Sequence, residues 1–186
     1  MPSRPLSHQA ALLVIDMQRG ICEGEYQAFE ADALVERINS LAKRAREAKV
    51  PVIWIHHEEA TGPLQHGTDG WQLAQGLSTQ TSDILVRKAT PDSFLRTGLE
   101  RLLKAHGVDS LIVCGLQTEY CVDTTTRRAL ALGYPVQLVS DGHSTLDTAN
   151  LTASKIIEHH NATLANIDSF GSRATLVAAA DVGFLQ

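Results

Sequence analysis

Several features are missing from this 186-residue sequence, and each absence excludes a class of protein. There are only three cysteines, with irregular spacing, so neither a disulfide framework nor a CxxC zinc site is expected. No apolar run reaches the roughly 18 residues of a membrane span, and Met1–Gln9 has no apolar stretch typical of a signal peptide. The net charge of −5 argues against nucleic acid as a partner, because phosphate binding needs a basic surface. We therefore expect a cytoplasmic protein that binds neither membranes nor nucleic acid.

Nucleotide-binding signatures are also missing. No G-x-G-x-x-G follows the first apolar run and no P-loop occurs, so a nucleotide-binding protein is not expected. What is present is an ordinary composition, with 44% hydrophobic and 20% charged residues. The length suits a single domain over residues 1–186, which needs no metal or disulfide to form a core.

Short, continuous apolar runs alternate with segments of helical periodicity. Continuous apolar strands are buried on both faces, and strand–helix alternation implies a parallel sheet with helices on both sides. The sequence thus predicts a three-layer α/β fold around a mostly six-stranded parallel sheet. The long segment from Glu58 to Ser82, rich in glycine, is expected to be a substrate-facing loop. The expected strands are Ala10–Ile15, Pro51–Ile55, Asp83–Val86, Ser110–Cys114, Pro135–Val139 and Ala162–Ala165, and the expected helices are Asp32–Lys49, Phe94–Ala105, Glu119–Leu132, Thr148–His160 and Ala174–Ala180.

Three reactive residues follow predicted strands, at the sheet edge where open parallel sheets bind ligands. Asp16 ends the first strand, Lys88 follows the third, and Cys121 lies just past the fourth. With Thr118 as the N-cap, Cys121 would lie near a helix start, where the dipole and Lys88 would lower its pKa. Asp16 could then accept the thiol proton. An aspartate at a strand end is equally often a turn or cap residue, so the spacing by itself leaves both interpretations open.

Three motifs carry a resemblance to a known family. They are LLVIDMQ at Leu12–Gln18, RKATPDSF around Lys88, and GLQTEYCVDTTTRRALALGY at Gly115–Tyr134. These stretches, their order and their spacing resemble isochorismatase-like cysteine hydrolases, over roughly residues 10 to 170. That family includes nicotinamidases, carbamoylsarcosine amidases and streptothricin hydrolases, and its fold is a Rossmann-like αβα sandwich.

The resemblance implies a catalytic triad with Cys121 as nucleophile, Asp16 as base and Lys88 as the group that stabilises the thiolate. It also implies a cis peptide bond between Leu116 and Gln117, with the N–H groups of Gln117 and Cys121 forming an oxyanion hole. The implied reaction is hydrolysis of a small-molecule amide, carbamoyl or lactam bond through a thioester, without a cofactor. Family members also suggest a homo-oligomer.

Four further residues are candidates for the substrate pocket. His57 is interpreted as a polar residue beside the pocket, and Tyr120 adjoins the nucleophile. Trp71 and Phe94 could line an apolar pocket, but packing in the core explains them equally well.

The stretch after the second strand departs from the nicotinamidase pattern. Nicotinamidases hold a metal there through Asp-x-His, whereas this sequence reads His57-Glu58-Glu59. The departure predicts a metal-independent amidase. Two alternatives remain open: a metal-assisted nicotinamidase that uses the His57 and Glu59 region, and a catalytically silent member that acts as a binding or assembly module.

Overall fold

The computed structural model describes residues 9–184, and it confirms the predicted fold class. Six parallel strands form one sheet in the order β3-β2-β1-β4-β5-β6. Residues 1–8, on which the argument about a signal peptide rests, lie outside the described part. The strands are β1 (Ala10–Ile15), β2 (Val52–His57), β3 (Ile84–Lys88), β4 (Ser110–Leu116), β5 (Val136–Ser144) and β6 (Ala174–Val177). The helices are α1 (Arg19–Cys22), α2 (Ala31–Glu47), α3 (Leu99–Ala105), α4 (Asp123–Ala131) and α5 (Ala153–Asn166), with short helical turns η1 (Gly24–Tyr26), η2 (Thr118–Val122) and η3 (Ala179–Asp181).

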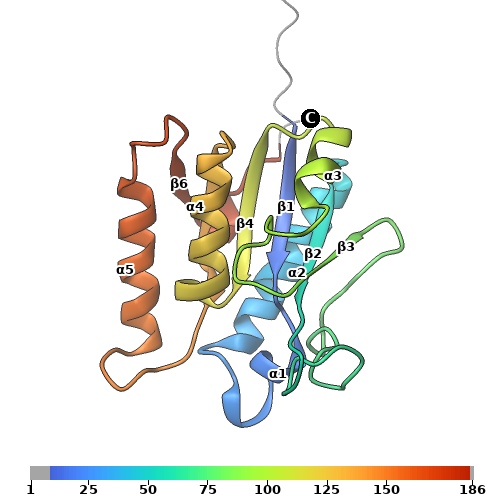
Figure 1. The fold of residues 1–186 in the computed structure, drawn as a ribbon. Coiled ribbons are helices and arrows are strands. Elements are labelled where there is room, and N and C mark those ends of the chain that lie inside the picture. The colour runs from blue at the N-terminus through green and yellow to red at the C-terminus, as the bar shows by residue number, and fades with distance from the viewer. Residues whose placement is uncertain (1–8, 185–186) are drawn as a thin grey trace, which may run out of the picture.

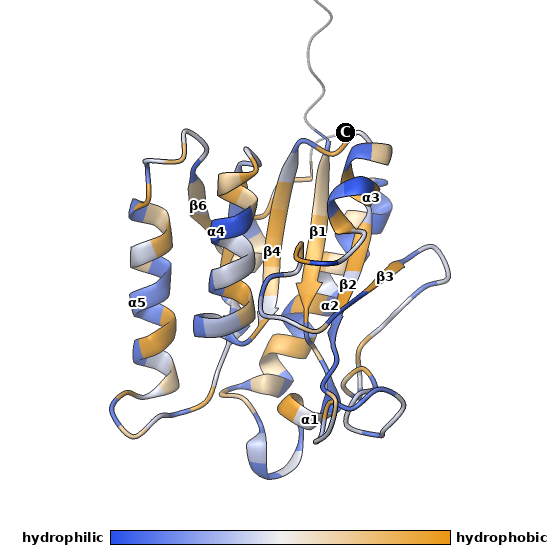
Figure 2. Cartoon of the chain, viewed as in Figure 1, coloured by the Kyte–Doolittle hydropathy of each residue, from blue (hydrophilic) through white to orange (hydrophobic). Residues whose placement is uncertain are grey.

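Helices cover both faces of the sheet (Figure 1), and the sheet separates two apolar cores. Successive residues of a strand point to opposite faces, so Leu12 and Val14 pack with α2 while Leu13 and Ile15 pack with α3, α4 and α5. Figure 2 shows the result, with apolar strands at the centre and helices that are apolar on one side only. Burying one leucine or isoleucine side chain completely contributes roughly 2 kcal/mol to the free energy of folding. Strand β1 has such side chains on both faces, so it stabilises both cores.

The strand order places a switch point beside β1. The chain runs from β1 outward to β2 and β3, then returns to β4 on the other side of β1. Ligands bind in the crevice that such a reversal leaves at the carboxyl ends of the strands. Helix α1 and the long loop between β2 and β3 lie at that end of the sheet (Figure 1).

Two sequence predictions near the C-terminus are wrong. The predicted strand Ala162–Ala165 belongs to α5, where Leu164 shares a buried face with Ile156 at helical spacing. The predicted helix Ala174–Ala180 is β6 followed by η3. The edge strand β6 is half exposed and owes its conformation to pairing with β5, a long-range contact that local propensity does not report.

Three helix starts also differ from the predictions. Helix α3 begins at Leu99 instead of Phe94, because Arg96 has a left-handed backbone (φ 57°) that interrupts a helix. Helix α5 begins at Ala153, after Thr152, whose side chain caps the N–H of Lys155. The predicted helix from residue 119 consists of η2, a π-helical turn, followed by α4.

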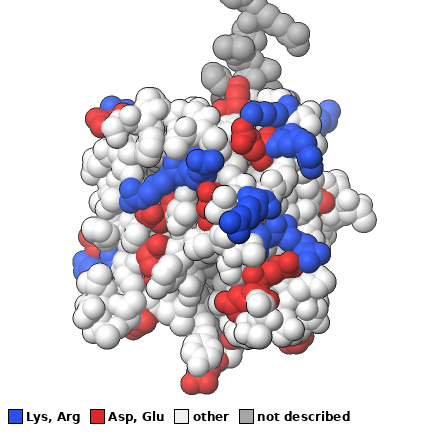
Figure 3. Space-filling view, in the orientation of Figure 1, with Lys and Arg blue, Asp and Glu red and all other residues white. Residues whose placement is uncertain are grey.

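The surface carries charges of both signs. Lys and Arg side chains are interspersed with Asp and Glu on the face in Figure 3. Within residues 9–184, no helix has the length and apolar character that crossing a membrane requires.

Candidate active site

The three residues predicted as a triad meet at the carboxyl ends of the strands. Asp16 follows β1, Lys88 ends β3, and Cys121 lies in η2 after β4. The Lys88 Nζ donates to Asp16 Oδ2 at 2.6 Å and to Cys121 Sγ at 3.2 Å. The Lys88 side chain is 0% exposed and that of Asp16 is 3% exposed. Folding therefore brings together residues that are 72 and 33 positions apart along the chain.

Gly115 explains how β4 leads the chain to this point, where the turn η2 carries Cys121. Its φ of 118° is accessible mainly to glycine, and a Cβ there would collide with the backbone of Ile15. Strand β4 can therefore approach β1 closely just before η2, beside Asp16. One residue further on, the peptide bond between Leu116 and Gln117 is cis, the conformation that the resemblance implies.

The start of η2, the turn that carries Cys121, differs from the prediction. Thr118 is not an N-cap: it is the first residue of η2, and its buried hydroxyl contacts the Nδ1 of His143 at 2.9 Å. Cys121 is the fourth residue of this π-helical turn instead of the third of an α-helix. It still lies in a first turn, where backbone N–H groups lack partners within the helix.

His57 completes the set of groups around the Lys88 ammonium. Its Nδ1 lies 3.0 Å from the Lys88 Nζ. An ammonium has three N–H donors and no acceptor, and here they match Asp16, His57 and Cys121. The Nδ1 atom must therefore accept, which places the proton of a neutral ring on Nε2. Burial, and next the Lys88 charge, lower the pKa of His57, which keeps the ring neutral.

The Cys121 thiol is not an exposed, preformed thiolate. Burial, reinforced by the Asp16 carboxylate and opposed by Lys88, raises the pKa of Cys121 to about 12. The predicted lowering of this pKa is therefore wrong for the unliganded site, because the loss of water outweighs the positive groups. At neutral pH the thiol therefore keeps its proton.

The Asp16 carboxylate has one oxygen available to accept a proton. Its Oδ2 is bound to Lys88, whereas its buried Oδ1 has no hydrogen-bond partner among the described residues. The ligand atoms of Asp16 and Cys121 lie within 4.8 Å of each other. With one carboxylate, one ammonium, a neutral His57 and a thiol, the cluster has no net charge. Moving the thiol proton to Asp16 keeps it neutral, which matters in a buried site.

A pocket of about 290 Å³ opens onto these groups. Of the four residues predicted to line it, His57 and Tyr120 do so. Trp71 and Phe94 are not among its lining residues: the Trp71 ring packs against His56 and His66, and Phe94 stacks with Tyr134 in the core. Aromatic type alone could not separate a pocket wall from core packing. The lining residues are Asp16, Ile21, His57, Glu59, Leu64, Pro91, Gln117, Tyr120 and Cys121.

Gln18, which was not among the predicted site residues, positions His57. The Gln18 Oε1 accepts from the backbone N–H of His57 at 2.8 Å, and its Nε2 donates to the carbonyls of His57 (3.1 Å) and Trp71 (2.9 Å). The side chain is buried and ties the end of β2 to the long loop. The sequence does contain a signal for this role: Gln18 is a polar residue at the end of the LLVIDMQ motif, three positions after the last residue of a buried strand.

A metal does not suit this cluster while Lys88 is in place. Asp16, His57 and Cys121 each offer a ligand atom, all within 4.8 Å of one another. The Lys88 Nζ already donates to each of these side chains, so a cation bound by the same atoms would meet the ammonium. Two like charges in a buried site repel strongly. The absence of a metal remains a prediction.

Fold and site define an α/β protein with a buried Asp–Lys–Cys cluster at a switch point of its sheet. A model of the Isochorismatase domain matches residues 10–177, and the chain belongs to the isochorismatase family. A solved isochorismatase family protein is 38% identical with a TM-score of 0.83, covering 91% of this chain and 98% of that one. A cysteine hydrolase from Pseudomonas syringae pv. phaseolicola 1448A is 26% identical with a TM-score of 0.84, covering 97% of this chain and 92% of that one.

A streptothricin hydrolase from Streptomyces noursei is 40% identical over 138 residues, which are 74% of this chain and 50% of that protein. The chain spans about half the length of the streptothricin hydrolases that it matches.

Proposed function

We propose that this protein hydrolyses an amide-type C–N bond of a small molecule, with Cys121 as nucleophile. The observation that carries the proposal is the Lys88 ammonium, which donates to both Asp16 and Cys121 in a buried site that opens onto a pocket. Similarity to a streptothricin hydrolase and to a cysteine hydrolase supports the same class of reaction.

The first stage forms a thioester. Asp16 takes the proton from the Cys121 sulfur as the sulfur attacks the carbonyl carbon of the substrate. The carbonyl oxygen gains negative charge, which the N–H groups of Gln117 and Cys121 stabilise, each worth about 3 kcal/mol in such sites. As the C–N bond breaks, the protonated Asp16 gives its proton to the leaving nitrogen. Ammonia or an amine departs, and the acyl group remains on sulfur.

Water completes the reaction in the second stage. Asp16, again ionised, removes a proton from the water that attacks the thioester carbon. The C–S bond breaks, the sulfur takes the proton that Asp16 now holds, and the carboxylic acid leaves. Lys88 stabilises the sulfur whenever it carries negative charge, and His57 holds the ammonium by accepting its third N–H. No step needs a metal or another cofactor.

The charge of the pocket favours some substrates over others. Among the lining residues, Asp16 is neutralised by Lys88 and His57 is neutral, so Glu59 supplies the net charge. Its neighbour Glu58 is instead paired with Arg87 at 2.5 Å. Ile21, Leu64 and Pro91 make much of the remaining wall apolar. We therefore expect neutral or cationic small amides to be preferred over anionic ones.

A panel of small amides, carbamoyl compounds and lactams in matched neutral, cationic and anionic forms tests the proposal. Ammonia release and mass spectrometry should identify substrates for the wild-type protein, whereas Cys121→Ser should be inactive. Cys22→Ser is the matched control, since Cys22 is buried in α1 outside the pocket. Turnover by Cys121→Ser at the wild-type rate would contradict the proposal.

The two alternatives predict other outcomes. A metal-assisted nicotinamidase would lose activity on chelation and regain it with zinc, iron or manganese, whereas we expect full activity after exhaustive chelation. A silent binding or assembly module would hydrolyse nothing in the panel. The predicted homo-oligomer and cytoplasmic location remain predictions.

A further inference from the structure

A buried histidine lies behind η2, the nucleophile turn that carries Cys121. It is not part of the cluster around Lys88. His143, in β5, is 3% exposed and contacts two side chains. Its Nδ1 lies 2.9 Å from the Thr118 Oγ1, and its Nε2 lies 3.0 Å from the Asn161 Oδ1. Thr118 begins η2, the turn that carries Cys121, and Asn161 belongs to α5. His143 thus connects α5 to the nucleophile turn.

The hydrogen bonds determine which ring nitrogen carries the proton. The Asn161 Nδ2 donates to the carbonyl of Ser140, so its Oδ1 faces His143, and a carbonyl oxygen can only accept. The His143 Nε2 must therefore carry a proton. Burial lowers the pKa of His143 to about 4, so the ring is neutral and Nδ1 is bare. The Thr118 hydroxyl then donates to Nδ1.

An irregularity of β5 brings His143 to this position. The pairing of β4 with β5 shifts from Val113–Leu138 to Gly115–His143, so β5 has additional residues between the two pairs. Such bulges re-aim side chains and are frequent beside active sites. Gly142 lies within the bulge, and a Cβ there would collide with the Val139 side chain. After the shift, His143 pairs with the glycine that precedes the cis peptide bond.

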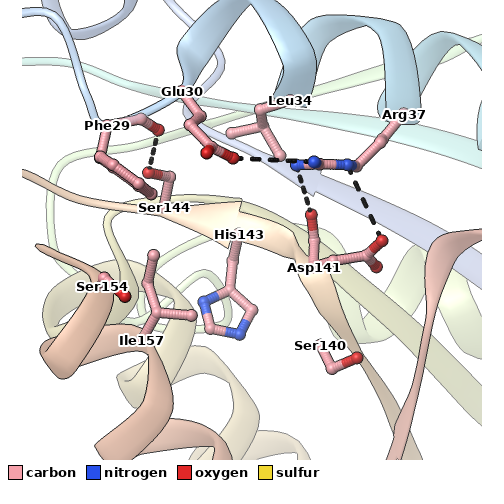
Figure 4. A pocket seen from close by; sticks show the side chains of 10 residues that line it. All are labelled: Phe29, Glu30, Leu34, Arg37, Ser140, Asp141, His143, Ser144, Ser154 and Ile157. Atoms are coloured by element: carbon pink, nitrogen blue, oxygen red, sulfur yellow. Dashed lines mark hydrogen bonds and ion pairs between the residues drawn. The ribbon is translucent and has the colours of Figure 1, made fainter.

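The residues after His143 also hold the turn. The Thr145 Oγ1 donates to Glu119 Oε1 at 2.9 Å, one residue along from Thr118. Figure 4 shows His143 beside a cavity of about 200 Å³, on the side of Ile157 and away from Arg37. Arg37, the one cation among the ten lining residues, is held by Glu30 and Asp141. The charged groups of this cavity thus bind one another, whereas His143 bonds to Thr118 in η2.

We propose that His143 is a positioning residue: anchored by Asn161, its ring holds the Thr118 hydroxyl and thereby fixes η2, so that the Cys121 sulfur stays against Lys88 and Asp16. This inference rests on the proposed role of Cys121 as nucleophile. His143 touches no substrate and transfers no proton.

Alkylation of Cys121 by iodoacetamide at pH 7.5 tests the inference without a known substrate. Saturation kinetics, followed by mass spectrometry of the intact full-length chain, separate the inactivation rate constant (kinact) from the binding constant (KI). We compare Thr118→Val, which removes the hydroxyl, with Thr118→Ser, which keeps it. The matched control is Thr126→Val, because the buried Thr126 hydroxyl has no hydrogen-bond partner in the described part of the chain. His143→Leu and His143→Asn, which retains an acceptor near the position of Nδ1, complete the set.

We expect kinact to fall about tenfold in Thr118→Val and His143→Leu with KI nearly unchanged, the equivalent of one hydrogen bond. Thr118→Ser and His143→Asn should recover most of the rate, and Thr126→Val should match the wild type. Mere loosening of the turn would expose the thiol and speed alkylation, so a faster reaction or an unchanged kinact in Thr118→Val overturns the inference. If His143→Leu does not fold, the comparison of Thr118→Val with Thr118→Ser decides whether the Thr118 hydroxyl positions Cys121. No selective alkylation of Cys121 in the wild type would instead refute the proposed function.

Discussion

Two neighbouring residues of β3 form ion pairs of similar length in different surroundings. Arg87 pairs with Glu58 at 2.5 Å, with the Arg87 side chain 49% exposed. Lys88 pairs with Asp16 at 2.6 Å, and its side chain is 0% exposed. Alternation along the strand sends one cation to solvent and the other into the site. The comparison shows that distance does not define a functional pair, since both pairs are short.

Burial changes what each pair does. Water screens the Arg87–Glu58 pair, so either partner can be lost without leaving an isolated charge in the interior. Lys88 and Asp16 are shielded from water, so losing either partner leaves the other as an isolated charge in the interior. The second pair also leaves Asp16 Oδ1 without a hydrogen-bond partner among residues 9–184. The buried pair thus keeps a carboxylate oxygen available to accept a proton, which the exposed pair does not.

The largest expected effect comes from the buried side of this comparison. Cys121→Ser should nearly abolish kcat/KM, because an alkoxide is far harder to form than a thiolate at neutral pH. Asp16→Asn should lower kcat/KM by roughly 10²–10⁴-fold, since the amide cannot take or return the proton. The Asp16/Cys121 double variant should be scarcely worse than the worst single, because the residues act as a unit. Near-normal turnover by a folded Asp16→Asn variant would refute the mechanism.

The next largest effect is a difference in the free energy of unfolding between variants of Lys88 and Arg87. Lys88→Ala leaves Asp16 buried without its partner and should cost roughly 3–5 kcal/mol of unfolding free energy. Arg87→Ala should leave that free energy unchanged within error. Urea unfolding measures both. In Lys88→Ala, any activity left should need higher pH, because Lys88 opposes the rise in the pKa of Cys121. Equal destabilisation by the two variants would show that burial is not the cause.

Two buried histidines, His56 and His143, should make the free energy of unfolding depend on pH. Burial lowers the pKa values of His56 and His143 to about 4, from an ordinary value of 6.5. Between these values the unfolded chain binds more protons, so stability falls as pH drops from about 6.5 to about 4, by at most about 3 kcal/mol for each histidine. His160 and Asp141 lie near His143 and have opposite effects on its pKa. Urea unfolding from pH 4 to 7 should show this slope, and His143→Asn should reduce it; an unchanged slope would contradict the assignment.

The smallest expected effect concerns two adjacent carboxylates. Glu59→Gln should reduce the preference for cationic over neutral amides by about fivefold at low salt, since Glu59 lines the pocket. Glu58→Gln removes the same charge next to it, but Glu58 is bound to Arg87 and does not line the pocket. Steady-state kcat/KM for a matched pair of substrates checks this. An equal change in both variants would mean that only net charge matters.

The three cysteines should differ in their rates of alkylation. Burial raises the pKa values of Cys22 and Cys114 as well as that of Cys121. Only Cys121 lines the pocket and has Lys88 and Asp16 beside it. Competitive alkylation at neutral pH, mapped by mass spectrometry, should therefore label Cys121 first. Preferential labelling of Cys22 would count against the proposed site.

The sequence by itself determined the α/β class, five of the six strands and the meeting of Asp16, Lys88 and Cys121. It could do so because apolar runs and helical periodicity are local signals, and because the carboxyl ends of parallel strands share one edge.

Only the tertiary structure decided the rest. Packing kept Trp71 and Phe94 out of the pocket lining, and pairing with β5 made a strand of Ala174–Val177. Folding also brought His57 onto Lys88 and removed enough water from Cys121 to keep its thiol protonated. These outcomes depend on burial and long-range contacts, which arise when distant segments pack together and which no local pattern of residues encodes.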